Sequence, residues 1–296
     1  MHTRSVVAIL AASIGWGLAG VGVRILFVDG VSTFTVVIGR VGIATLALGF
    51  FALYGRRSIS QEAWRRGSAI GVLRIGLAPT FFISSLNFIS AGFEALVITL
   101  VPVTTAVFAH VLIGEKLTTR QFAGLGLGLT GTAVLILSGD SGIADGGNTL
   151  VGGGLALGGV LTGSLSGVVA RRYAPHHGTR ELAVPMFVAG SAIVVLVGGL
   201  VGDVDPTALS ASGWTLLVGL ALASTLLPFV ATLYASAYAS AATVALTGYL
   251  APVVGLVGGV MILGELVTPA IAVGAVLTVA GVAIAGRSRQ ALPTAG

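Results

Sequence analysis

The feature that most constrains this chain is a series of apolar runs, each long enough to cross a lipid bilayer. A spanning helix needs about 20 apolar residues. Such runs lie near residues 5–27, 32–54, 67–89, 91–113, 119–138, 150–170, 181–202, 212–235, 238–262 and 266–286. Transmembrane β-strands instead alternate in polarity over about ten residues, and these runs are continuously apolar. The pattern predicts an all-α membrane protein with ten transmembrane helices.

The charged residues are too few for a water-soluble protein of 296 residues. Only 8% are Asp, Glu, Lys or Arg, against roughly a quarter in soluble domains, and 55% are hydrophobic. A net charge of +5 could suggest a nucleic-acid partner, but that requires a basic face on a soluble surface. We expect the lipid bilayer as partner and no nucleic acid. The absence of cysteine excludes disulfides, thiolate metal sites and Cys nucleophiles, and we expect no metal and no cofactor.

The Lys and Arg residues outside the apolar runs indicate how the chain crosses the membrane. They all fall in alternate connections or at the ends of the chain: Arg4, Arg56, Arg57, Arg65, Arg66, Lys116, Arg120, Arg171, Arg172, Arg180, Arg287 and Arg289. Positive charges mark the cytoplasmic side, so both termini are predicted to be cytoplasmic and the protein to be a multi-pass protein of the inner (plasma) membrane. The first run ends in Arg24 without a cleavage-like motif, and we interpret it as a retained span.

The two halves of the chain resemble each other at an offset of 150 residues. Residues Ala95, Leu96, Leu100, Pro102, Val103, Gly114, Glu115, Thr118, Gly124 and Gly131 recur as Ala245, Leu246, Leu250, Pro252, Val253, Gly264, Glu265, Thr268, Gly274 and Gly281. Each half contains five runs, so the second copy enters the membrane inverted. We predict a first five-helix repeat at 1–139, a non-cytoplasmic linker at 140–149, an inverted repeat at 150–287 and a cytoplasmic tail at 288–296. Inverted repeats suit transport by alternating access, with the solute near the midplane.

The repeated segments also resemble a known family. The stretches AGFEALVITLVPVTTAVFAHVLIGEKLTTRQFAGLGLGLTG and AATVALTGYLAPVVGLVGGVMILGELVTPAIAVGAVLTVAG are similar to the two signature stretches of EamA-type proteins of the drug/metabolite transporter (DMT) superfamily. The GWG at residues 15–17 and Arg40 also resemble that family's opening helices. The resemblance implies a ten-helix fold, a central cavity formed by helices 1–4 and 6–9, and export of metabolites or amphipathic compounds.

Charged residues inside apolar runs are candidates for function, because an unpaired charge in hydrocarbon costs several kcal/mol. Arg40 and Glu94 are placed at similar depth, so an ion pair between them would bind a zwitterion or release a proton during the cycle. A static structural pair, or separate snorkelling to the interface, is the alternative. Arg24 and Arg74 are interpreted as snorkelling anchors.

Two prolines interrupt matching helices at mid-depth. Pro102 and Pro252 each lack an amide hydrogen, which bends a helix and frees a carbonyl. They are candidate gating hinges, or they provide the curvature that opens a cavity. Glu115 and Glu265 follow at the helix ends, and with Thr118 and Thr268 they are interpreted as caps for the next helices rather than as transport groups.

Several polar and aromatic residues fall on the helices expected to line the cavity. The candidate substrate-binding residues are Trp16, Arg40, Asn87, Glu94, Tyr234, Tyr238, Thr243 and Thr247. Interface anchoring of the aromatic residues and bonding of Thr to its own helix are the competing interpretations.

We therefore predict a secondary transporter that exports a small organic metabolite, either an amino acid or an amphipathic, drug-like compound. Protons are a candidate coupling ion, and the oligomeric state is left open. The alternative is a membrane-embedded enzyme or lipid scramblase built on the same bundle. An enzyme is not expected, because Gly163, Ser164, Leu165, Ser166 and Gly167 have Leu where a nucleophile elbow has Ser.

Overall fold

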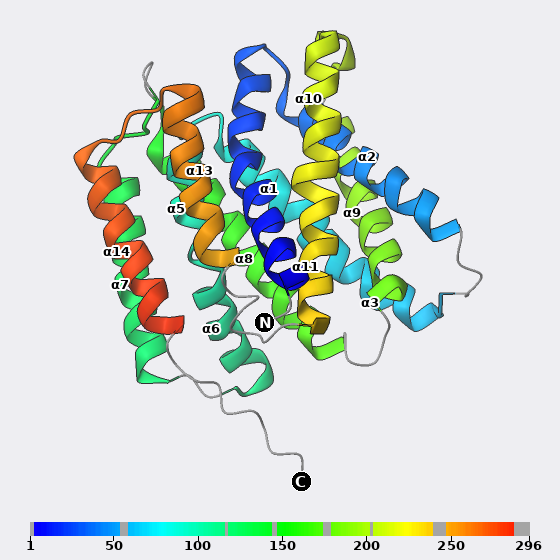
Figure 1. Ribbon diagram of the computed structural model, residues 1–296, viewed down its shortest axis with the longest axis horizontal. Coiled ribbons are helices and arrows are strands. Elements are labelled where there is room, and N and C mark those ends of the chain that lie inside the picture. Colours follow the sequence, from blue (N-terminus) through cyan, green and yellow to red (C-terminus); the bar gives the residue numbers. More distant parts are fainter. Residues whose placement is uncertain are drawn as a thin grey trace.

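The computed structural model describes residues 3–53, 59–115, 118–143, 147–173, 179–201, 204–238 and 247–286, and these ranges contain helices and connections but no strand. The α-helices are α1 Thr3–Val28, α2 Thr33–Leu53, α3 Gln61–Gly71, α4 Ala78–Ser85, α5 Ala91–Ile98, α6 Val101–Ile113, α7 Thr119–Leu137, α8 Thr149–Tyr173, α9 Thr179–Val201, α10 Ala211–Ala221, α11 Leu227–Tyr238, α13 Thr247–Leu263 and α14 Pro269–Gly286. Two π-helices, η1 Val72–Leu77 and η4 Leu222–Leu226, and a 3₁₀ turn, η3 Pro206–Ala208, complete the described elements. Figure 1 shows the helices packed side by side in one bundle.

Eight helical segments are long and apolar enough to cross a membrane. They are Val7–Val28, Thr33–Phe50, Gln61–Ser85, Ala91–Ile113, Thr119–Leu137, Thr149–Ala170, Glu181–Val201 and Ala211–Thr232. Two shorter apolar helical stretches, Leu250–Leu263 and Pro269–Gly281, lie where the ninth and tenth spans are predicted. The prediction of a multi-pass helical membrane protein is confirmed, and the count of ten stays a prediction.

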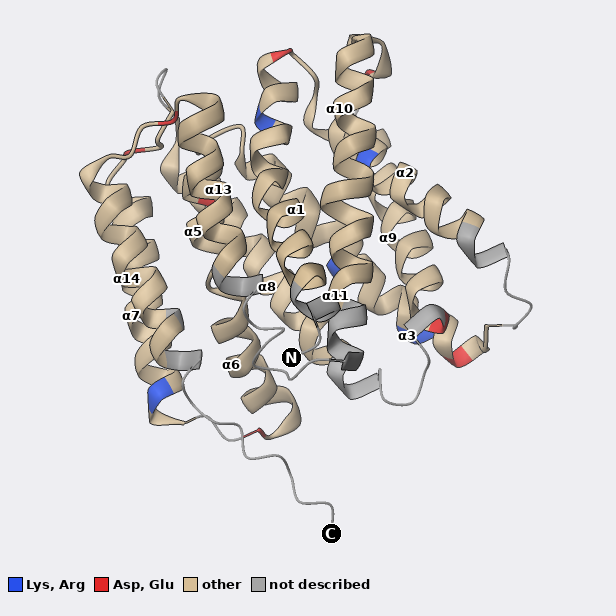
Figure 2. Ribbon diagram, viewed as in Figure 1, with Lys and Arg blue, Asp and Glu red and all other residues tan. Residues whose placement is uncertain are grey.

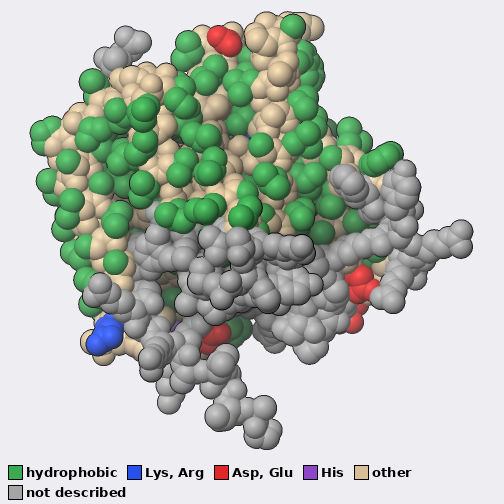
Figure 3. Space-filling view, in the orientation of Figure 1, with side chains coloured by type: hydrophobic (Ala, Val, Ile, Leu, Met, Phe, Trp, Pro, Cys, Tyr) green, Lys and Arg blue, Asp and Glu red, His purple; other side chains and the backbone are tan. Residues whose placement is uncertain are grey.

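The outer surface of the bundle is apolar where lipid would contact it. Large side chains such as Met261, Val276 and Leu200 are more than two thirds exposed. Figure 3 shows hydrophobic side chains covering most of the described surface on the face in view. A surface of this kind is costly in water and favourable in hydrocarbon, so the packing agrees with a membrane environment.

Two spans contain a π-helix directly before a proline. In η1 the amide of Ala78 donates to Leu73, five residues earlier, and Pro79 follows. In η4 the amide of Leu227 donates to Leu222, and Pro228 follows. A proline cannot donate to the carbonyl four residues before it, and the wider π-turn accommodates its ring. Hydropathy did not reveal either π-helix.

The two candidate hinge prolines differ in their local structure. Pro102 follows a break at residues 99–100, where the chain leaves α5 and starts α6. Pro252 instead lies inside the continuous helix α13. The residues that precede α13, 239–246, lie outside the described part of the chain. The predicted interruption is therefore observed at Pro102, and hinge motion at either proline stays a prediction.

Matching turns end α6 and α13. Gly114 and Gly264 both have a positive φ, of 73° and 65°, a conformation in which glycine carries no steric penalty. Thr118 then caps α7 through Gln121, and the hydroxyl of Thr268 accepts the amide of Ile271 at 3.3 Å. The predicted threonine caps are confirmed.

Acidic residues dominate the connections at one end of the bundle, whereas the opposite end has arginines together with acidic residues such as Glu62 and Glu115. Asp29, Asp140, Asp205 and Glu265 lie in connections at one end, which we name the acidic end. The arginines Arg65, Arg66 and Arg120 lie at the opposite end, which we name the arginine end. Figure 2 shows red segments on the upper connections, and both blue and red segments at the lower end of the bundle.

Helix α1 lies at the centre of the bundle and positions the candidate site. It packs mainly against α13 and α11, also contacts η4 and α10, and meets α5 near the acidic end. Close approach depends on glycine: a Cβ on Gly15 would lie 2.2 Å from the Ala223 carbonyl oxygen, and one on Gly17 would lie 2.5 Å from that of Ala251. Small residues let membrane helices approach this closely.

Candidate functional site

Arg40 on α2 reaches across to the π-helix η4. Its Nε donates to the Thr225 hydroxyl at 2.6 Å and its Nη2 donates to the Ser224 carbonyl oxygen at 2.7 Å. In a regular α-helix the Ser224 carbonyl would accept the amide hydrogen of residue 228. Residue 228 is proline, which has no amide hydrogen. Arg40 therefore supplies the donor that the proline removes.

The expected Arg40–Glu94 ion pair is absent from this structure. No nitrogen of Arg40 lies within 4.0 Å of the Glu94 carboxylate, and among the described residues the one ion pair that close joins Arg66 to Glu62. Although the two residues were expected at similar depth, Arg40 instead binds the carbonyl that Pro228 leaves free.

Glu94 is a buried carboxylate without a hydrogen-bond donor in the described part of the protein. It lies in the first turn of α5, it is 6% exposed, and its Oε2 is 3.0 Å from where a Cβ on Gly20 would lie. The charged groups that act on it electrostatically are Arg40 and Glu265. A buried carboxylate without partners is costly unless it is protonated or meets a cation.

Glu265 binds the start of α5 rather than the start of its own next helix. Its Oε1 accepts the amide of Ala91 at 2.7 Å, and its Oε2 accepts the amide of Gly92 at 3.0 Å. These are two of the amides that a helix start leaves without an internal partner. The prediction that Glu265 caps the helix after it is wrong, because the open turn at Gly264 directs the side chain to a neighbouring span.

Arg24 and Asn87 lie at the acidic end, at helix termini. The Nη1 of Arg24 donates to the Leu86 carbonyl at the end of α4 at 2.9 Å, and its buried Nε has no hydrogen-bond partner among the described residues. Arg24 therefore binds protein backbone. Asn87 is exposed, and its amide donates to the Thr33 hydroxyl at 2.8 Å and to the Ser84 carbonyl.

The other candidates are only partly described. Trp16 is half-buried on α1, and Arg74 is half-buried in η1. Tyr234, Tyr238 and Thr247 lie on helices, but their side chains are outside the described part of the protein, as is the whole of Thr243. The structure thus brings Glu94 near Gly20 and not into contact with Arg40, and it leaves the contribution of the aromatic and hydroxyl candidates as a prediction.

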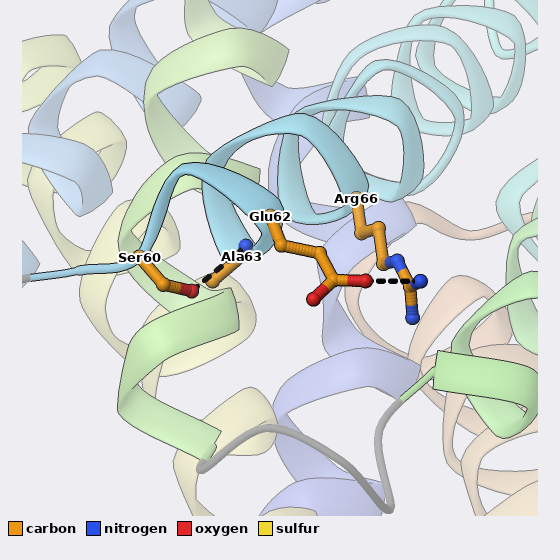
Figure 4. Close-up of polar contacts among 4 residues, drawn as sticks. All are labelled: Ser60, Glu62, Ala63 and Arg66. Carbon is orange, nitrogen blue, oxygen red and sulfur yellow. Dashed lines mark hydrogen bonds and ion pairs between the residues drawn. The ribbon is translucent and has the colours of Figure 1, made fainter.

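A cavity of about 690 Å³ lies at the arginine end, at the start of α3. Its described lining residues are Gln61, Glu62, Trp64, Arg65 and Ser68. Ser60 caps this helix through the Ala63 amide, and Glu62 pairs with Arg66 one turn later, as Figure 4 shows. These polar side chains stabilise the first turn of α3 and are separate from Glu94.

The serines that resemble a nucleophile elbow are used in packing. Ser164 and Ser166 are fully buried. Their hydroxyls donate to the carbonyls of Val101 at 3.1 Å and Gly163 at 2.6 Å. They satisfy helix backbone, as expected for small polar residues within a membrane helix.

Comparison with known proteins gives consistent results. A protein named "Probable terminal-alkyne amino-acid exporter", from Streptantibioticus cattleyicolor, is 26% identical over 293 residues, covering 96% of this chain and 94% of the relative. A solved crystal structure shares the fold, with a TM-score of 0.64 and 20% identity over 96% of this chain and 97% of that chain. The model of the EamA-like transporter family matches residues 3–137 and 150–287. These two matches cover most of the sequence, and the chain therefore belongs to the EamA-like transporter family.

Proposed function

We propose that this protein is a secondary transporter that exports a small organic metabolite carrying an ammonium group, with Glu94 as the group that receives the cation. An amino acid is the substrate class we favour, because the relative from Streptantibioticus cattleyicolor is named as an amino-acid exporter. Membership in a transporter family favours transport over the alternative of a membrane enzyme or scramblase.

The observation that carries the proposal is the environment of Glu94. The carboxylate is 6% exposed and has no hydrogen-bond donor among the described residues, yet it lies on α5 where that helix meets the central α1. A solute ammonium or a proton would supply the missing positive charge. Competition between these two cations for one carboxylate would couple export to proton entry.

Contacts between α7 and α14 support the proposed inverted repeat. A Cβ on Gly131 would lie 2.8 Å from the Gly274 carbonyl, and one on Gly281 would lie 2.6 Å from the Gly124 carbonyl. The offset of 150 residues relates Gly124 to Gly274 and Gly131 to Gly281. Replacing each glycine by its counterpart in the other half therefore turns the first contact into the second. The two family matches, at residues 3–137 and 150–287, and the two π-helices, which begin at Val72 and Leu222, follow nearly the same offset. Such symmetry suits alternating access.

The orientation is also a proposal. The arginine end would face the cytoplasm and the acidic end the opposite side of the inner membrane, because positive charges stay on the cytoplasmic side during insertion. The cavity that the resemblance implies among helices 1–4 and 6–9 would then open alternately at the two ends.

The test is transport in proteoliposomes, with zwitterionic amino acids and amphipathic amines as solutes, with and without a pH gradient. Glu94→Gln should lower transport about tenfold or more, since tenfold corresponds to about 1.4 kcal/mol and a lost buried charge contact exceeds that. It should also remove dependence on the pH gradient. Glu62→Gln, which neutralises an exposed carboxylate at the arginine end, is the matched control. Wild-type rates and pH dependence in Glu94→Gln would overturn the proposal.

A further inference from the structure

The acidic end contains a junction of three helices that joins the two halves of the chain. Gly20 on α1 lies against Ala91 on α5, and Gly92 lies against Leu256 on α13. Val21 on α1, which is 3% exposed, packs against Gly258 on α13. Helices α1 and α5 belong to the first half and α13 to the second. An opening of the acidic end has to separate helices in this junction.

The Glu265 carboxylate links the end of α13 to the start of α5 at the acidic end of this junction. Its two oxygens bind the amides of Ala91 and Gly92, so the connection after α13 is attached to the first turn of α5. A carboxylate is well suited to this place, because a helix start carries partial positive charge. The contact thus crosses between the halves with two charge-assisted hydrogen bonds.

The surroundings fit a carboxylate closely. A Cβ on Gly259 would lie 2.2 Å from the Glu265 Oε2, so a side chain at 259 would displace the carboxylate. Two further backbone bonds attach neighbouring connections: Ser90 donates to the Ser141 carbonyl at 2.9 Å, and Leu266 donates to the Gly142 carbonyl at 3.4 Å. Neither of these bonds involves a charged group, so the Glu265 contact is expected to be stronger than either of them.

We propose that Glu265 is the latch of the gate at the acidic end: its bonds to α5 hold this end closed, and they break each time the end opens. This inference rests on the proposed alternating access. A carboxylate at the membrane surface has water available to replace the two amides when it leaves, so the bonds can be exchanged reversibly.

The test uses the absence of cysteine in this chain. Val21→Cys places a single thiol inside the junction, and its rate of reaction with a membrane-impermeant maleimide, added on the acidic side of sealed vesicles, reports opening. In the Val21→Cys background, Glu265→Gln should react about tenfold faster or more, because it loses the negative charge and its one side-chain oxygen can accept from only one of the two amides. Glu265→Ala should react faster still.

Asp140→Asn is the matched control, since it removes one negative charge from the same end without touching α5; its labelling rate should equal that of the parent. Equal rates in the parent, Glu265→Gln and Glu265→Ala would overturn the latch. Loss of the folded protein in both Glu265 variants, seen by size-exclusion chromatography, would also overturn it, because a latch must be dispensable for folding. Labelling needs no solute, so it tests the latch independently of the substrate. Faster labelling of the Glu265 variants, together with no amino-acid transport by the parent protein, would support the latch and refute the substrate proposal.

Discussion

The bond between Arg40 and the Ser224 carbonyl predicts a specific energetic coupling between Arg40 and Pro228. Arg40 donates to a carbonyl that lacks its usual partner because residue 228 has no amide hydrogen. Removing Arg40 leaves that buried carbonyl without a donor, at a cost of about 1–3 kcal/mol. If residue 228 is alanine, its own amide can satisfy the carbonyl, and the loss of Arg40 should then cost less.

A double-mutant cycle of Arg40→Ala and Pro228→Ala isolates this quantity. The coupling energy should be about 1–3 kcal/mol, with Arg40→Ala more destabilising next to proline than next to alanine. The coupling is more informative than either single change, because Arg40→Ala also removes a charge from apolar surroundings and this offsets part of its cost. The free energy of unfolding can be measured by denaturant titration in detergent micelles.

The matching proline of the other half provides the control. Pro79 follows η1 as Pro228 follows η4, and Arg40 makes no hydrogen bond to η1. The cycle of Arg40→Ala with Pro79→Ala should therefore be additive. A coupling below about 0.5 kcal/mol in the Pro228 cycle would refute the view that Arg40 replaces the missing amide.

Two other predictions concern helix packing and a surface carboxylate. Gly131→Leu should destabilise the protein by about 1–3 kcal/mol, because a Cβ there would lie 2.5 Å from the Thr278 hydroxyl. Gly126→Leu is the control: a Cβ at residue 126 would have nothing within 4 Å, so the thermal unfolding midpoint should stay near the parent value. The Thr207 side-chain hydroxyl and backbone amide, in that order, lower the pKa of the exposed Asp205 carboxyl below its ordinary 3.8. The stabilisation from the ionised Asp205 is present above its unfolded-state pKa and is lost as pH falls through the lower folded-state pKa. Thr207→Val should raise the Asp205 pKa in a carboxyl ¹³C NMR titration. An unchanged titration would contradict the assignment.

Local sequence properties predicted the elements that depend on local physics. Span positions follow from hydropathy, which each segment carries by itself. The caps at Thr118 and Thr268 depend on residues within three positions, and the break before Pro102 depends on one missing amide. The family resemblance rested on whole repeated segments, and the family match agrees with it.

Contacts between spans were harder to predict, because they depend on how helices rotate and slide against each other. Equal depth suggested that Arg40 would pair with Glu94, whereas Arg40 binds the opposite π-helix. The prolines at 79 and 228 are a sequence signal that could have predicted the contact between Arg40 and η4. Each proline frees a carbonyl within the membrane, and a nearby arginine can donate to it. The reach of Glu265 to α5 joins residues more than 170 apart, and no local pattern encodes it.

The supply of free backbone donors and acceptors explains why Glu94 has no hydrogen-bond partner among the described residues. Carbonyls become free wherever a helix ends or a proline follows, and Arg24 and Arg40 each bind one. Amide donors become free only at helix starts. At the start of α5 all four are occupied: the Ser141 carbonyl accepts from residue 90, Glu265 from residues 91 and 92, and the Ser90 hydroxyl from residue 93. The carboxylate of Glu94 therefore has no backbone donor within its own turn, and under the proposed function the missing positive charge is a proton or the solute ammonium.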